Sequence, residues 1–148
     1  MTTTRRQMLC LVGAATVLPA PVAHASPDSA RQALQSILGN AKPQTGRVTI
    51  ELPPLVENGN SVVVQVSVSS PMTAQDHVKA IHLVAEGNPL PSIMTAYFYP
   101  ENGRATFTSR IRLAESQRVW AIAQMSDGSY WQGHADTLVT LSACTEER

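Results

Sequence analysis

Apolar residues after Gly46 recur at every second position, a pattern typical of β-strands with one buried face. The alternation is clearest between residues 61 and 69, where Val62, Val64, Val66 and Val68 share one side. Comparable runs recur at short, regular spacing and predict strands over 48–52, 61–69, 78–85, 93–99, 104–113, 118–125 and 130–141. About seven short strands favour an all-β fold, an immunoglobulin-like antiparallel β-sandwich.

Turn-forming residues separate these runs. Asp127-Gly128 lies between two strand-like runs, which is a strong hairpin signal, and Asn102-Gly103 predicts another tight turn. Asn58-Gly59-Asn60 turns the chain before residue 61, and Ser70-Pro71-Met72-Thr73 breaks the strand that follows. The short connections agree with an antiparallel arrangement.

The run 104–113 assigns its side chains to two faces. Those predicted to point inward are Ala105, Phe107, Ile111 and Leu113. Those predicted to point outward are Arg104, Thr106, Thr108, Arg110 and Arg112. The outward arginines could steer an anionic arm or an acidic partner, although a solvated sheet face is the simpler interpretation.

A short amphipathic helix is predicted before the strands. Ser26-Pro27-Asp28 combines a cap, a proline and an acid suited to a first turn, and Gly39 supplies the stop. The apolar stripe at helical spacing comprises Ala30, Ala33, Leu34, Ile37 and Leu38. The stripe needs a surface to cover, either the sheet of this domain or that of a partner.

Two of the predicted strands, 93–99 and 118–125, are apolar on both sides. A two-layer sandwich buries only one face of each strand, so the second face is predicted to bind another protein. Phe98 and Trp120 are the candidate contacts, if they lie on that face. Coverage by the leading helix or by a long loop is the alternative.

The N-terminus has the order of an export signal. Arg5-Arg6 precedes an apolar run over 9–18, and Ala23-His24-Ala25 fits a small-residue cleavage site. The paired arginines predict the twin-arginine route and a periplasmic protein that starts near Ser26. The apolar run is too short for a membrane span, and Cys10 is expected to leave with the signal.

Charge and titratable residues exclude several function classes. The chain has 11 basic and 11 acidic side chains, so nothing indicates a nucleic-acid partner. His77 and His82 would face opposite ways on one strand and His134 is remote, so neither a metal site nor a cofactor is predicted. Without the signal one cysteine remains, Cys144, which cannot form an internal disulfide and is flagged as a reactive or intermolecular thiol.

Cys144 follows the last predicted strand by three residues. An extended chain advances about 3.5 Å per residue, so the thiol could stand about 10 Å clear of the sheet. A thiol on a short tether suits delivery into the active site of another protein, while an incidental cysteine at a chain end is the alternative. A hydrolase is disfavoured because a nucleophile needs a positioned base and a rigid frame.

Several motifs together resemble the SoxY family, the sulfur carriers of periplasmic thiosulfate oxidation, from the region of Arg47 to Cys144. They are Glu57-Asn58-Gly59-Asn60-Ser61-Val62, Ser69-Ser70-Pro71-Met72-Thr73, Ile81-His82, Asn88-Pro89-Leu90-Pro91, Thr108-Ser109-Arg110-Ile111-Arg112-Leu113-Ala114 and Met125-Ser126-Asp127-Gly128-Ser129. The resemblance implies an immunoglobulin-like domain without catalysis of its own, paired with a SoxZ-like subunit. It implies that Cys144 holds sulfur intermediates covalently, while SoxAX loads thiosulfate, SoxB removes sulfate and the sulfane dehydrogenase oxidises the remaining sulfur.

The tail departs from the family pattern, in which Gly-Gly-Cys-Gly-Gly ends the chain. Here Ser142-Ala143 precedes Cys144, and Thr145-Glu146-Glu147-Arg148 follows it. The two carboxylates oppose thiolate formation and repel thiosulfate. The alternative is therefore a SoxY-like interaction module that keeps the fold and the SoxZ-like partner but carries no thiosulfate.

These observations predict four segments. They are a signal peptide over 1–25, a leading helix and linker over 26–45, the immunoglobulin-like domain over 46–141, and a C-terminal arm over 142–148 that carries Cys144.

Overall fold

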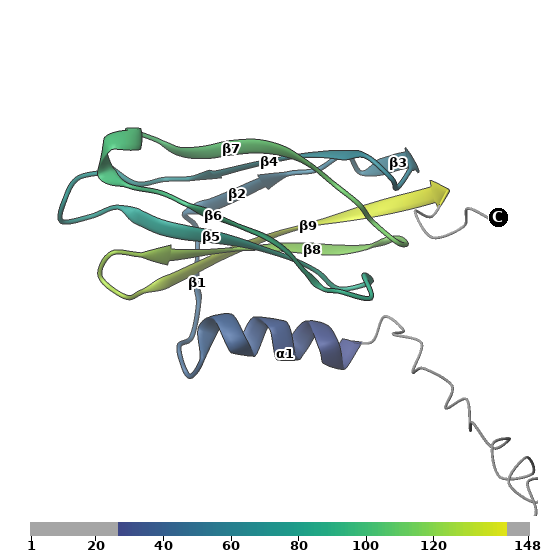
Figure 1. The fold of residues 1–148 in the computed structure, drawn as a ribbon, viewed down its shortest axis with the longest axis horizontal. Coiled ribbons are helices and arrows are strands. Elements are labelled where there is room, and N and C mark those ends of the chain that lie inside the picture. The colour runs from purple at the N-terminus through teal and green to yellow at the C-terminus, as the bar shows by residue number, and fades with distance from the viewer. Residues whose placement is uncertain (1–26, 142–148) are drawn as a thin grey trace, which may run out of the picture.

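The computed structural model describes residues 27–141, in which two β-sheets pack face to face (Figure 1). The larger sheet has the order β1 (Gln44–Thr45), β9 (Tyr130–Leu141), β8 (Gln117–Met125), β5 (Val78–Ala85) and β6 (Ser92–Tyr97), and β3 (Leu55–Asn58) pairs with β9. The smaller sheet has the order β2 (Val48–Glu51), β4 (Val62–Val68) and β7 (Ala105–Ile111). This arrangement confirms the predicted immunoglobulin-like sandwich.

The structure contains two strands, β1 and β3, that the sequence pattern did not predict. Both are short and both pair in parallel with β9, Gln44 opposite Trp131 and Leu55 opposite Leu138. β1 has only two residues, and the four residues of β3, Leu-Val-Glu-Asn, do not alternate between apolar and polar. Their conformation depends on β9, which lies more than eighty positions away in the sequence.

The core between the sheets follows the predicted alternation. Val62, Val64, Val66 and Val68 are buried, and the intervening Val63 and Gln65 are exposed. The inward residues of β7 and its continuation are also buried or packed against the core: Ala105, Phe107, Ile111 and Leu113. Each fully buried large apolar side chain contributes about 2 kcal/mol.

The predicted helix is α1 (Pro27–Leu38), and Gly39 ends it with a φ of 58°. Ser26, the predicted cap, lies outside the described residues. Ala30 is buried and the rest of the apolar stripe is half-buried. The helix packs on the outer face of the larger sheet, against β5 (Figure 1). The leading helix therefore covers part of the outer face of the larger sheet, which is the alternative considered above.

The predicted turns are present. Gly128 joins β8 to β9 with a φ of 84°, and Gly103 follows the 3-10 turn η1 (Pro100–Asn102) with a φ of 71°. Among the described residues, α1 is neither long enough nor apolar enough to cross a membrane.

Candidate functional site

Cys144 lies outside the described residues, so the site is described from the strand that leads to it. β9 ends at Leu141, three residues before the cysteine. We call residues 137–141, with β3 and Ser116 beside them, the arm root. Its hydrogen bonds determine the point from which the C-terminal arm starts.

On one side, the arm root is held by β3 and by the two prolines before it. The Thr137 hydroxyl donates to the Pro53 carbonyl at 2.7 Å, and the Leu138 amide donates to the Pro54 carbonyl at 2.9 Å. The Thr140 hydroxyl donates to the Glu57 carbonyl at 3.1 Å. Because these bonds involve three of the last five residues of β9, this side of the strand has hydrogen-bond partners almost to its end.

On the other side, Ser116 continues the pairing beyond the start of β8. The Val139 amide donates to Ser116 Oγ at 2.8 Å. At the end of the strand, the Gly59 amide donates to the Leu141 carbonyl at 2.9 Å, and the Gly59 carbonyl accepts from the Leu113 amide at 2.8 Å. Gly59 thus links the arm root to the smaller sheet.

The surface of the arm root carries polar and apolar side chains. Leu55, Leu138 and Leu141 are exposed, although each is a large apolar side chain. The predicted outward arginines are also exposed, and Arg110 donates to Ser61 Oγ at 3.2 Å. Arg112 directly precedes Leu113, whereas Arg104 lies at the other end of β7.

Phe98 corrects one sequence prediction. It was a candidate for the partner-binding face, but its side chain is only 9% exposed and belongs to the core. Its ring centroid lies 6.4 Å from that of Phe107 in the opposite sheet. The exposed aromatic side chains of this segment are its neighbours Tyr97 and Tyr99.

Trp120 lies on the outer face of the larger sheet, half-buried in a polar cluster. Its indole N–H donates to Glu86 Oε1 at 2.6 Å, and its ring lies 4.8 Å from that of His134. Arg118 donates to both carboxylate oxygens of Asp136, at 2.7 and 3.1 Å. That hydrogen bond lowers the pKa of Asp136 and raises the pKa of Arg118.

The three histidines of the domain lie apart. His82 projects from the outer face of β5 with its Nδ1 2.9 Å from Thr95 Oγ1, and burial lowers its pKa. His77 lies in the loop before β5, and the His134 ring packs at a tilt of 49° against Trp120. Within residues 27–141, no three histidine, cysteine, aspartate or glutamate side chains gather closely enough to hold a metal ion.

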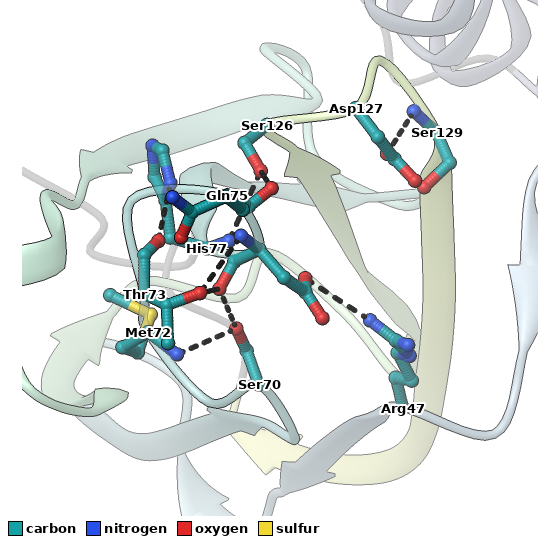
Figure 2. Close-up of polar contacts among 10 residues, drawn as sticks. Arg47, Ser70, Met72, Thr73, Gln75, His77, Ser126, Asp127 and Ser129 are labelled. Atoms are coloured by element: carbon teal, nitrogen blue, oxygen red, sulfur yellow. Dashed lines mark hydrogen bonds and ion pairs between the residues drawn. The ribbon is translucent and has the colours of Figure 1, made fainter.

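A second polar cluster occupies the loop between β4 and β5, at the opposite end of the sandwich from the arm root (Figures 1 and 2). His77 Nδ1 lies 3.0 Å from the Thr73 carbonyl, and the His77 amide donates to Ser126 Oγ at 3.1 Å. Asp76 pairs with Arg47 at 3.6 Å, and Met72 is buried with a φ of 51°. These contacts connect the loop to the β8–β9 hairpin, which indicates a structural role.

Sequence reasoning did not identify the arm root, because its exposed leucines belong partly to β3. The available signal was Leu55-Val56 between Pro53-Pro54 and Asn58-Gly59. Two apolar residues between breakers predict a strand only when a partner strand is known.

Comparisons with known proteins agree with this architecture. A family model of the sulfur oxidation protein SoxY matches residues 34–144. The solved structure of the sulfur carrier protein SoxY from Chlorobium limicola f thiosulfatophilum is similar, with a TM-score of 0.64 and 21% identity, over 78% of this chain and 100% of that one. A superoxide reductase (neelaredoxin) from Ignicoccus hospitalis is similar in fold, with a TM-score of 0.57 and 24% identity, over 79% of this chain and 95% of that one. No curated protein sequence matches the chain.

Proposed function

Because this chain belongs to the SoxY family, whose model matches residues 34–144, we propose that it is a periplasmic sulfur carrier that holds sulfur intermediates covalently on Cys144. The observation that carries the proposal is the position of the match, which extends to Cys144 itself. Cys144 is also the cysteine that remains when the proposed signal peptide over 1–25 is removed.

The chemistry requires a thiolate and an external oxidant. The Cys144 thiol loses its proton, and its sulfur forms a bond with the outer sulfur of thiosulfate while two electrons pass to the loading enzyme, for which SoxAX is the candidate. Water then cleaves the terminal sulfur–sulfur bond, which releases sulfate and leaves a persulfide. The carrier contributes the nucleophilic sulfur, and the partner enzymes contribute the catalysis.

The arm root supports this role. Hydrogen bonds donated by Thr137, Thr140 and Gly59, and one accepted by Ser116, hold the strand up to Leu141, so the arm leaves the domain from a defined point. A reactive group on a short tether needs such an anchor, because the anchor decides which volume the group can reach.

A SoxZ-like subunit is the proposed constant partner. Its proposed binding surface is the part of the larger sheet around Tyr97 and Tyr99, which we call the tyrosine face. Tyr97 and Tyr99 are 72% and 66% exposed, and with Lys79 and Gln124 they line a shallow hollow. Aromatic residues are enriched at protein interfaces and often dominate their binding energy. The packing of α1 leaves these tyrosines uncovered.

The test is the intact mass of the protein after incubation with thiosulfate and a SoxAX enzyme. A sulfur adduct should form on the natural protein, and Cys144→Ser should not form it. Circular dichroism should show the same melt for both proteins. Failure of the natural protein to form an adduct would favour the second candidate, a SoxY-like interaction module, which the carboxylates of Glu146 and Glu147 favour.

A further inference from the structure

A crevice of about 350 Å³ lies between the first turns of α1 and the larger sheet. Pro27 and Ala30 belong to its helix side, and Glu86, Glu115 and Gln117 belong to its sheet side. We call it the α1 crevice. The N-terminal end of α1, and the crevice with it, lies at the same end of the sandwich as the end of β9 (Figure 1).

Two carboxylates of the sheet side have no cation beside them. Glu86 is half-buried, and its Oε1 accepts the indole N–H of Trp120 at 2.6 Å. The Glu115 side chain lies over Gly87, where a Cβ atom would meet its Oε1 at 2.8 Å. Within residues 27–141, the three ion pairs that form involve neither Glu86 nor Glu115. The sheet side of the crevice therefore carries negative charge that no side chain of these residues neutralises.

The arginines nearest to the crevice have other partners. Arg31, on the helix side, pairs with Asp28 at 3.3 Å, and both side chains are exposed. Arg118 binds both carboxylate oxygens of Asp136. Its pKa is raised first by that hydrogen bond and least by the charge of Glu86. Because Asp28 is also acidic, the charges around the crevice favour the binding of a further cation.

The start of the mature chain supplies such a cation. Ser26 lies outside the described residues and directly precedes Pro27, which lines the crevice. Removal of the proposed signal peptide over 1–25 gives Ser26 a free α-ammonium group. From standard backbone dimensions, its nitrogen lies within about 5 Å of the Cα atom of Pro27. The residue before a proline is restricted to extended backbone, so the ammonium has few directions to take.

From these observations we propose that the α1 crevice binds the new N-terminus of the processed chain. The α-ammonium of Ser26 pairs with Glu86 and Glu115 and fastens α1 to the larger sheet. Its three N–H donors suit two carboxylates. The positive end of the α1 dipole opposes a cation at this place, but it equals only about half a charge, against a full charge on each carboxylate.

Processing creates this contact. In the unprocessed chain the nitrogen of Ser26 belongs to an uncharged peptide bond and cannot form the ion pairs. Cleavage after Ala25 would thus hold α1 more firmly on the outer face of the larger sheet. The inference rests on the proposed removal of residues 1–25, and it does not depend on the sulfur chemistry of Cys144.

The first test measures the pKa of the α-amino group in the secreted protein. The pH dependence of its acetylation, followed by mass spectrometry of the N-terminal peptide, gives the value. We expect it to lie about one unit above the ordinary range of about 7.7–8.0, so that acetylation at pH 7 is about tenfold slower. Glu86→Gln and Glu115→Gln should each lower it, because glutamine keeps the acceptor oxygen and removes the charge. Glu51→Gln, at an exposed position of β2 in the smaller sheet, is the matched control and should leave it unchanged.

The second test removes the charge of the N-terminus without changing the sequence. Acetylation of the α-amino group at mildly acid pH, where the lysines stay protonated, neutralises it. Trypsin cleaves after Arg31 only when α1 opens locally, and we expect this cleavage to be several-fold faster in the acetylated protein. In the double variant Glu86→Gln/Glu115→Gln, acetylation should make little difference, because the ion pairs are already absent.

Three outcomes would overturn the inference. The first is an α-amino pKa that is equal in the natural protein and in both glutamine variants. The second is equal cleavage after Arg31 in the free and acetylated proteins. The third is a mature chain that N-terminal sequencing shows to begin at a residue other than Ser26. None of these results changes the formation of an adduct on Cys144, so a failure here is distinguishable from a failure of the carrier proposal.

Discussion

The hydroxyl of Thr137 donates a hydrogen bond of 2.7 Å to the carbonyl of Pro53, across 84 positions of sequence. Thr137 is also a buried polar side chain, with 3% of its surface exposed. The bond joins the start of the arm root to the segment that leads into β3. It is therefore a long-range contact that helps to position both β3 and the start of the arm.

Thr137→Val should test this contact, because valine keeps the shape of threonine and removes the donor. We expect the free energy of unfolding to fall by about 1 kcal/mol, the usual net value of one hydrogen bond. Urea denaturation measures the change. Thr140→Val, at an exposed position of the same strand, should have a smaller effect, and equal losses in the two variants would contradict the ranking.

The second prediction concerns Phe98 and its neighbour Tyr99. Phe98→Ala should lower the free energy of unfolding by about 3 kcal/mol, because it leaves a cavity in the core beside Phe107. Tyr99→Ala removes a 66% exposed side chain and should change stability by no more than about 0.5 kcal/mol. Thermal melts of the two variants measure the difference. Similar melting temperatures would contradict the placement of the Phe98 side chain in the core.

The third prediction concerns the close approach of β9 to β2 at Gly133. A Cβ atom at this position would lie 2.6 Å from the backbone carbonyl oxygen of Val48. Since backbone cannot move aside cheaply, Gly133→Ala should destabilise the domain by about 2 kcal/mol. Gly87→Ala is the comparison, because its Cβ would meet side chains and not backbone: Glu115 at 2.8 Å, which can rotate away, and the Gln117 Cβ at 3.2 Å, which needs a shift of a few tenths of an ångström. Chemical denaturation should give a clearly lower free energy of unfolding for Gly133→Ala than for Gly87→Ala.

The fourth prediction is a dependence of stability on pH. Burial lowers the pKa of His82 in the folded protein below its ordinary value of 6.5. In the unfolded chain His82 takes up a proton near that ordinary value, so the unfolded state binds more protons as the pH falls. The stabilising contribution is fully present above pH 6.5 and is lost as the pH falls through the lowered pKa.

His82→Gln should reduce this dependence. The change in unfolding free energy between about pH 7.5 and pH 5 should be smaller in the variant than in the natural protein, since glutamine does not titrate. Denaturation curves at several pH values measure it. Asp136, whose pKa is lowered by Arg118, loses its contribution only at more acid pH, below its ordinary value of 3.8. An identical pH profile in His82→Gln would contradict the assignment.

The fifth prediction concerns the tail itself. The change removes Glu146–Arg148 and puts glycines in place of Ser142, Ala143 and Thr145. Loading of Cys144 should become faster, because the two carboxylates no longer oppose the thiolate and less bulk hinders entry into an active site. Stopped-flow loading with a SoxAX enzyme measures the rate. Equal rates for the natural and glycine tails would show that charge and bulk do not matter. Loading of the glycine tail alone would assign the natural protein to the interaction-module class.

The sequence alone determined those features that depend on neighbouring residues. The period of two in 61–69 decided that Val62 and Val64 face the core, and the three- and four-residue spacing in α1 decided which side of the helix packs. Asp127-Gly128 specified a hairpin because its conformation is local. The family could also be identified from short motifs, because they preserve such local patterns along most of the chain.

Only the tertiary structure decided features that depend on distant partners. In the apolar run 93–99, periodicity separates Phe98 from Tyr97 but does not say which of the two faces the core. The position of the opposite sheet decides this, and it buries Phe98 against Phe107. β3 shows no alternation of apolar and polar residues, and it forms because β9 supplies backbone partners from more than eighty positions away. For the same reason Leu55 and Leu138 become neighbours only when the two strands meet.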